Sequence, residues 1–138
     1  MSGALTDAVV TAVQKILEVS AFELADVVEA GPPPPGAITA RLAFHGPHRG
    51  EMHLWIEPEE ARAFASATLG IEAPDADAVD DAVRELANMI CGHVLSETYS
   101  DECIALDRAE LSAPPLEVYG VQLAGEHGGL GVTVEVVS

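Results

Sequence analysis

The chain has few cysteines and few basic residues, and each shortage excludes a class of protein. Its two cysteines, Cys91 and Cys103, cannot form the disulfide framework of a small secreted domain. Six lysines and arginines stand against 23 acidic residues, which gives a formal net charge of −17. Such a charge repels nucleic-acid phosphates and anionic lipids, so we expect neither a nucleic acid nor a membrane as partner. The charge suits a protein partner that carries a basic patch.

The chain also has no long apolar run. None of its hydrophobic stretches is long enough to span a bilayer, and its beginning has no basic-then-apolar signal sequence. We therefore expect a cytoplasmic protein. A length of 138 residues and a hydrophobic content of 49% predict a single domain over residues 1–138 with a substantial core.

Several motifs of enzymes and metal sites are missing. The sequence has no GxxxxGK phosphate loop, no GxGxxG turn between a strand and a helix, and no GxSxG elbow. The five histidines are His45, His48, His53, His93 and His127. Only His45 and His48 share a loop, and no neighbouring acid or cysteine completes a ligand set. We expect no metal site and no cofactor held by this chain.

The hydrophobic periodicity predicts helices and strands in separate runs. Helices are expected at Leu5–Phe22, from Pro58 to about Leu69, and from about Ala78 towards Thr98. Alternating residues predict a β-hairpin of Ile38–Phe44 and Glu51–Glu57, and further strands follow Ser100 within Cys103–Leu111, Leu116–Ala124 and Val132–Val137. The glycine-rich Gly125–Gly131 is expected to be a turn. This order favours an α+β fold with an antiparallel sheet packed against long helices.

The helix that begins near Ala78 carries the most distinctive surface. Its apolar stripe consists of Val79, Val83, Leu86, Ala87, Ile90 and Val94. Glu85, Asn88 and Gly92 fall on the opposite side, and Glu85 and Asn88 are neighbours because they are three residues apart. Cys91 lies beside the stripe and is expected to pack in the core. A glycine inside a helix costs about 1 kcal/mol relative to alanine, and either helix packing or the close approach of a partner can explain Gly92; packing is the explanation we favour.

The run ELANMICGH, at Glu85–His93, resembles the signature of the CheX-type chemotaxis phosphatases, in which an ELANMIAGN-like run lies on a long helix. The layout is also similar: a leading helix, a strand pair that ends in WIEPEE at Trp55–Glu60, an alanine-rich helix, an acidic spacer, the signature helix, and then strands. His93 departs from the family run, in which asparagine is common. It falls near the buried edge of the helix, away from Glu85 and Asn88, so the change is expected to affect packing.

The resemblance implies a CheX/CheC-like fold and a phosphatase that acts on the phospho-aspartate of a CheY-type response regulator. By this resemblance Asn88 orients the attacking water and Glu85 pairs with a lysine of the partner. The partner binds the Mg²⁺. A single signature helix per chain is typical of the CheX type, whose members form homodimers.

Two other interpretations stay open at this stage. The chain could be a non-catalytic CheX-like domain that binds a signalling partner without hydrolysis, or a purely structural acidic dimer. The spacing Glu85-x-x-Asn88 alone does not separate a catalytic surface from a solvated helix face, since exposed polar residues are common. Trp55 is expected either in the core or at a contact between subunits.

Overall fold

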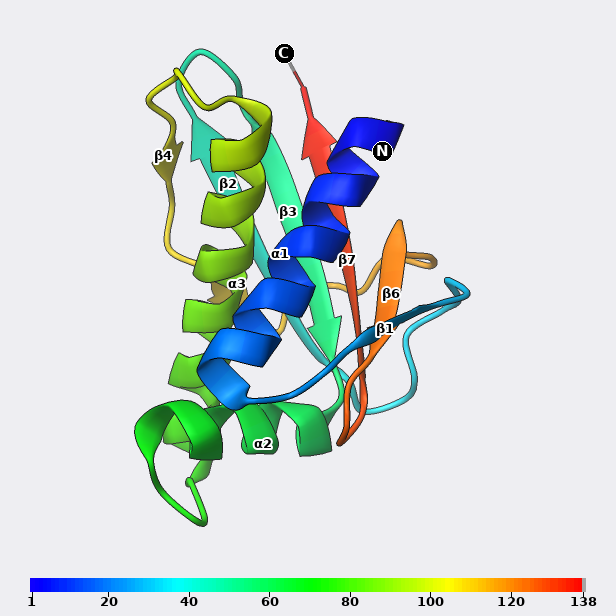
Figure 1. The fold of residues 1–138 in the computed structure, drawn as a ribbon, viewed down its shortest axis with the longest axis vertical. Helices are drawn as coiled ribbons and strands as arrows, with labels where there is room; N and C mark the ends of the chain where they lie inside the picture. Colours follow the sequence, from blue (N-terminus) through cyan, green and yellow to red (C-terminus); the bar gives the residue numbers. More distant parts are fainter. Residues whose placement is uncertain (138) are drawn as a thin grey trace.

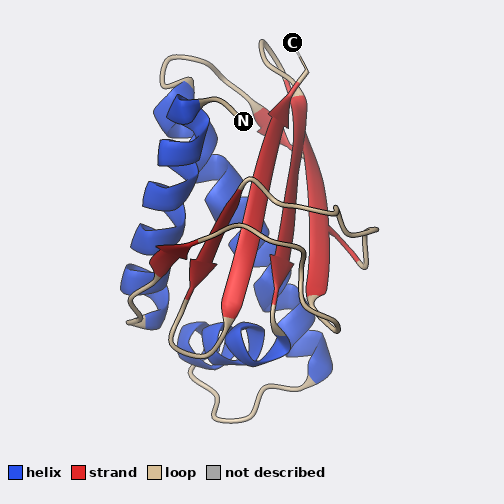
Figure 2. Cartoon of the chain, turned by 90° about the vertical axis from the view of Figure 1, so that its right-hand side faces the viewer, coloured by secondary structure: helices blue, strands red, loops and turns tan. Residues whose placement is uncertain are grey.

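Helices α1 (Gly3–Ala21) and α3 (Ala76–Thr98) lie on one face of an antiparallel sheet, and α2 (Pro58–Leu69) crosses their ends at one end of the sheet (Figures 1 and 2). The computed structural model describes residues 1–137. The strands are β1 (Asp26–Val28), β2 (Ile38–His45), β3 (Gly50–Ile56), β4 (Ala105–Leu106), β5 (Glu110–Leu111), β6 (Val121–Ala124) and β7 (Gly129–Val136). This architecture confirms the predicted α+β class.

The sheet has the order β1-β6-β7-β3-β2-β4, and β5 also pairs with β2. The predicted hairpin is present: β2 and β3 pair from Ile38↔Ile56 to Phe44↔Gly50. The C-terminal strand β7 lies beside β3, with Leu54 opposite Val132. Because the chain returns to the middle of the sheet only at its end, the centre of the sheet depends on contacts between distant segments.

The core fills the space between the sheet and the helices. Strand side chains that point to this face are apolar, as the alternating pattern predicts, and they pack against the buried stripes of α1 and α3. Helix α2 presents small side chains to the core, since Ala61 and Ala65 are buried. It begins with Pro58 and ends at Gly70, whose φ of 70° lies in the left-handed region that glycine adopts readily.

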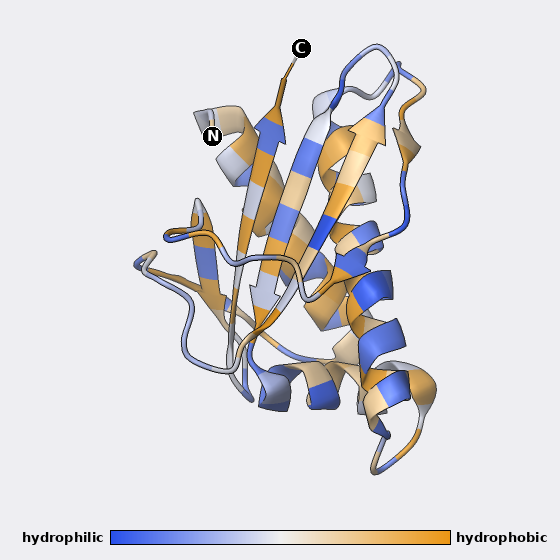
Figure 3. Ribbon diagram, turned by 180° about the vertical axis from the view of Figure 1, so that it is seen from behind, coloured by the Kyte–Doolittle hydropathy of each residue, from blue (hydrophilic) through white to orange (hydrophobic). Residues whose placement is uncertain are grey.

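The outer face of the sheet carries a second, smaller group of buried side chains. Strands seen from behind alternate between hydrophilic and hydrophobic residues (Figure 3). Trp55 points to this face and is only 1% exposed, because Tyr119 lies edge-on to its ring at a centroid distance of 6.4 Å. Within the chain, Trp55 is therefore a packing residue beneath a loop, and no helix covers it.

The region after α3 contains less strand than the sequence predicts. Cys103–Leu111 forms only the two-residue strands β4 and β5, and strand within Leu116–Ala124 begins only at Val121. Tyr119 explains the second difference, since the loop that carries it crosses the sheet to cover Trp55. The predicted turn Gly125–Gly131 is also shorter than expected, because β7 begins at Gly129.

Candidate functional site

Helix α3 begins with a side-chain cap and buries the predicted stripe. The Asp75 carboxylate accepts a hydrogen bond from the Ala78 N–H at 2.8 Å, which satisfies one of the free donors of the first turn. All six stripe residues, Val79, Val83, Leu86, Ala87, Ile90 and Val94, are buried. Packing of this stripe against the core determines which side of α3 faces outward.

Glu85 lies on the outward side of α3, as predicted. Its side chain is exposed and forms no ion pair or side-chain hydrogen bond within residues 1–137. The neighbouring charges on this helix are paired with each other, since Arg84 binds Asp81 at 3.0 Å. The Glu85 carboxylate is therefore free to accept a charge-assisted hydrogen bond from another molecule.

Asn88 is less exposed than its position on the helix predicts. The residue is half-buried, and its Oδ1 is covered yet has no hydrogen-bond partner among residues 1–137. A side-chain amide can accept and donate hydrogen bonds at the same time. A buried polar atom without a partner costs free energy, so an amide in this state is a candidate for an external ligand such as water.

A segment after α3, which the helical pattern does not reveal, runs beside the outward side of the helix. Residues 104–111 run back alongside α3 (Figure 1), held to the sheet by the pairing of Phe44 with Leu106 and of Ala40 with Leu111. Ile104 and Leu106 pack against the core. Less of the outward side of α3 is therefore exposed to solvent than a helical wheel indicates.

Gly92 occupies an open position on the same side. A Cβ atom placed on it meets nothing closer than the Leu106 Cδ1, at 4.0 Å. This is ordinary contact, so packing within the chain does not require glycine here, and the packing explanation that we favoured is wrong. The close approach of a partner is the remaining explanation from the sequence.

Cys91 and His93 complete the signature run. Cys91 is fully buried, and burial raises the pKa of its thiol to about 12, so the thiol is neutral and unreactive at physiological pH. This confirms its predicted place in the core. His93 is half-buried, in agreement with its predicted position near the buried edge of the helix.

Two histidine–carboxylate pairs tie the β2–β3 loop to the segment after α3. His45 Nε2 lies 2.9 Å from the Asp107 carboxylate, and His48 Nε2 lies 2.6 Å from that of Glu102. The His48 ring also stacks on Tyr99, with the ring centroids 3.8 Å apart. Within residues 1–137, no three His, Cys, Asp or Glu side chains are grouped so that they could hold a metal ion. These histidines hold the segment whose Leu106 lies next to Gly92.

A second carboxylate cluster, which the sequence did not reveal, lies at the end of the sheet near α2. Glu23 and Glu60 are buried, and both accept hydrogen bonds from the β6–β7 turn, Glu23 from the Glu126 N–H and Glu60 from the His127 N–H. Burial and the adjacent Glu23 carboxylate raise the pKa of Glu60 from 4.5 to about 8. Such a shift can mark a functional site, but both carboxylates face turn backbone, which indicates a structural role.

Within the described part of the chain, none of the three helices is long and apolar enough to cross a membrane.

Comparison with known proteins identifies relatives of this fold. Residues 38–117 match the family model described as chemotaxis phosphatase CheX. Among solved structures, the chain is similar to CheX of Vibrio vulnificus (TM-score 0.75, 14% identity, 99% of each chain covered). It is also similar to CheX of Desulfovibrio desulfuricans (TM-score 0.72, 17% identity, 96% of this chain and 98% of that chain). No protein in a search of curated sequences matches significantly.

One further structural relative was solved with a second protein. The CheX-CheY-BeF3-Mg²⁺ complex of Borrelia burgdorferi matches with a TM-score of 0.70 at 14% identity, over 96% of this chain and 97% of that chain. At these identities the structural likeness establishes a shared fold.

Proposed function

Because this chain belongs to the CheX family of chemotaxis phosphatases, we propose that it hydrolyses the phospho-aspartate of a CheY-type response regulator. The observation that carries the proposal is the outward side of α3. There Glu85 and Asn88 stand three residues apart, and neither forms a side-chain hydrogen bond within residues 1–137. The related complex from Borrelia burgdorferi, which contains a CheY, supports the choice of partner.

In this proposal Asn88 acts on the attacking water. Its amide orients the water so that the water oxygen forms a bond to phosphorus on the side opposite the aspartyl oxygen. The bond between phosphorus and the aspartyl oxygen breaks, and the partner keeps a free carboxylate. Phosphate leaves as HPO4²⁻ with one proton of the water, and the other proton passes to the solvent. Mg²⁺, when bound by the partner, neutralises phosphoryl charge.

Glu85 acts as an anchor in the same proposal. Its exposed carboxylate pairs with a lysine of the regulator, which fixes the position of α3 on the partner surface. Gly92, one turn beyond Asn88, leaves room for the partner backbone. A homodimer in the cytoplasm is also part of the proposal, as the sequence resemblance implies.

The test is phosphate release from the receiver domain of a response regulator encoded near this protein, phosphorylated with a small-molecule donor. We expect the wild-type chain to accelerate release and Asn88→Ala to reduce the acceleration by about 100-fold, since misplacing a reacting group costs about that much. Titration should show that Asn88→Ala binds the phosphorylated domain nearly as well as the wild type. If Asn88→Ala keeps the wild-type rate, the assignment of Asn88 is wrong.

Glu85→Gln separates anchoring from chemistry. We expect a raised KM and a nearly unchanged kcat, because the carboxylate acts in the formation of the complex. Glu97→Gln is the matched control: it makes the same change at an exposed position of the same helix, about 18 Å further along the axis. A wild-type chain that binds the phosphorylated domain without shortening its lifetime would instead indicate the non-catalytic binding domain.

A further inference from the structure

Basic side chains are scarce in this chain, and half of them form ion pairs with acidic side chains of the same chain. Arg41, Arg62 and Arg84 form ion pairs with acidic side chains. Within residues 1–137, no acidic side chain lies within ion-pair distance of the other three, Lys15, Arg49 and Arg108. In a protein with 23 acidic residues, an exposed cation without a partner is unusual.

Arg108 lies beside α3 at the level of Asn88. Leu106 is next to Gly92, and from there the extended segment and the helix run in opposite directions (Figure 1). Two residues of extended chain span about 6.6 Å, which equals about 4.4 residues of helix. Arg108 is two residues after Leu106, and Asn88 is four residues before Gly92. Arg108 and Asn88 are therefore at about the same level along the helix axis. Arg108 also lines a cavity of about 530 Å³ together with Arg84 and Asp80, which are one and two turns before Asn88, so it lies against this stretch of α3.

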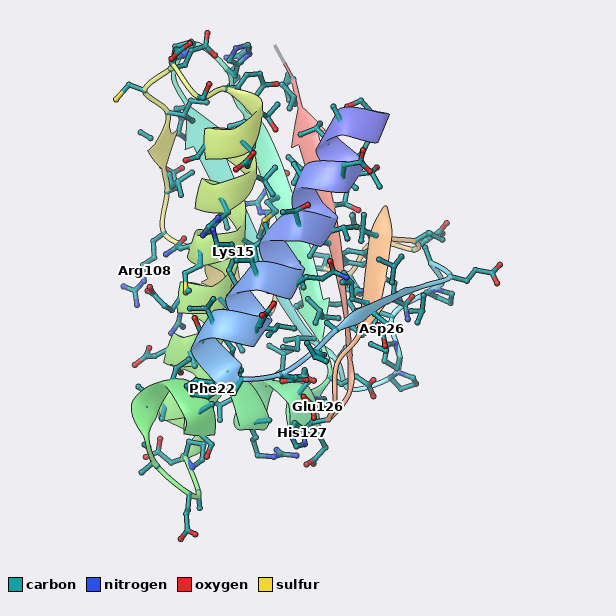
Figure 4. All side chains as sticks on the ribbon, viewed as in Figure 1. Lys15, Phe22, Asp26, Arg108, Glu126 and His127 are labelled. Carbon is teal, nitrogen blue, oxygen red and sulfur yellow. The ribbon has the colours of Figure 1, made fainter. Side chains whose placement is uncertain are left out.

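The Arg108 side chain points into solvent on the side of α3 that lies away from α1 (Figure 4). Its two acidic neighbours along the segment are both paired elsewhere, Asp107 with His45 at 2.9 Å and Glu110 with Arg41 at 3.1 Å. Within residues 1–137 the guanidinium group therefore forms no ion pair.

Lys15 borders the opposite side of α3. It is exposed on α1 and lies between α1 and α3 in Figure 4. It continues, at helical spacing, the row of Ala4, Ala8 and Thr11 that lines a groove with Glu97 of α3. The two unpaired cations thus stand on either side of the surface that carries Glu85 and Asn88.

A cation at this place offsets the repulsion between this acidic chain and the anionic phosphorylation site of the proposed partner. A phosphorylated receiver site is strongly anionic, because it combines a phosphoryl group with the carboxylates that hold Mg²⁺. A chain with a net charge of −17 repels such a site, and Glu85 adds to the repulsion nearby. Arginine is suited to the contact because its planar guanidinium group binds carboxylate and phosphoryl oxygens with two hydrogen bonds.

We propose that Arg108, assisted by Lys15 on the opposite side of α3, is a specificity-determining residue that binds the anionic rim of the partner's phosphorylation site. This inference rests on the proposed function for the identity of the partner. Its role is in docking: Arg108 guides and holds the phosphorylated partner over Asn88, and it takes no part in placing the water.

The test compares Arg108→Ala with Arg49→Ala. Arg49 is the matched control, since it is also without an ion pair but lines a cavity with Glu51 and Glu135, side chains of the outer side of the sheet. In the dephosphorylation assay we expect Arg108→Ala to raise KM by about 10-fold, the usual effect of losing one good charged contact, with kcat unchanged. Arg49→Ala should leave both constants near the wild-type values.

Two further measurements make the result decisive. The dependence of kcat/KM on salt should be shallower for Arg108→Ala than for the wild type, because a steering charge is lost. Arg108→Lys should restore most of the affinity at low salt. Equal effects of Arg108→Ala and Arg49→Ala, a fall in kcat with an unchanged KM, or no restoration by lysine would each overturn the inference.

Failure of the inference is distinguishable from failure of the proposed function. Binding of the receiver domain activated with beryllofluoride and Mg²⁺ is measured by titration, without any hydrolysis. If the wild type binds but does not hydrolyse, the phosphatase proposal fails, and weaker binding by Arg108→Ala still supports a docking role. If the wild type hydrolyses and Arg108→Ala binds like the wild type, only the inference about Arg108 fails.

Discussion

At the scale of single residues, Glu60 shows how one buried carboxyl group links stability to pH. It is fully buried at the start of α2, close to Glu23, while Glu57 and Glu126 lie near the same turn. In the unfolded chain Glu60 has its ordinary pKa of 4.5, and in the folded chain the pKa is about 8. Between these two values the folded state keeps a proton that the unfolded state releases.

The stability that Glu60 contributes is therefore complete below about pH 4.5 and is lost as the pH rises towards about 8. We predict that the melting temperature falls between about pH 5 and pH 8, and that Glu60→Gln makes this fall smaller, because glutamine cannot lose a proton. Thermal unfolding followed by the fluorescence of Trp55, the only tryptophan of the chain, measures both. Parallel pH profiles for the two proteins would contradict the prediction.

Asn88 illustrates a different point at this scale. Its amide oxygen is covered and unpaired within residues 1–137, a state that lowers stability. This state is expected if Asn88 serves an external ligand, as we propose, because functional residues are often arranged for a ligand and not for the folded chain alone.

At the scale of elements, α3 combines a rigid buried face with an outward side that carries Glu85 and Asn88. Its cap at Asp75 and its buried stripe hold the helix in place. Gly92 destabilises the helix, since a glycine in a helix interior lowers its stability by about 1 kcal/mol relative to alanine.

We predict that Gly92→Ala raises the free energy of unfolding by up to about 1 kcal/mol, because Leu106 at 4.0 Å leaves room for the methyl group. The same change should weaken binding of the phosphorylated receiver domain, since the methyl group stands where the partner approaches. Urea unfolding and titration measure the two effects. A loss of stability would show that the contact with Leu106 is already too tight for a methyl group.

At the scale of the whole molecule, the sheet is covered on both faces, by helices on one side and by the loop around Tyr119 on the other. Trp55 and Gly131 are neighbours across the β3–β7 pair, and the indole ring lies directly over the glycine. This close approach requires the absence of a side chain at position 131.

We predict that Gly131→Ala destabilises the protein by about 1–3 kcal/mol, the usual cost of overpacking a core. A Cβ atom there overlaps the indole nitrogen of Trp55, and the ring cannot move freely because it is 1% exposed. Denaturant unfolding measures the loss, with Gly31→Ala as control, because a Cβ atom at Gly31 meets nothing within 4 Å. Equal stability of both variants would contradict this prediction.

Local patterns in the sequence determined the helices, the β2–β3 hairpin and the side of α3 that carries Glu85 and Asn88. The helical period placed all six stripe residues of α3 in the core, and alternation identified the β2–β3 hairpin. These features depend on neighbours a few residues away, so the sequence alone contains them. The three-residue spacing of Glu85 and Asn88 is local in the same sense.

Tertiary structure alone decided the features that join distant segments. The position of Arg108 depends on the path of residues 104–111 along α3. The partial burial of Asn88 likewise depends on the folded chain and not on its place in the helical period. The burial of Glu60, which the sequence presents as one of the acids in the first turn of a helix, depends on Glu23 and on the turn after β6. No local period encodes such contacts, because they form between segments that only the folded sheet brings together.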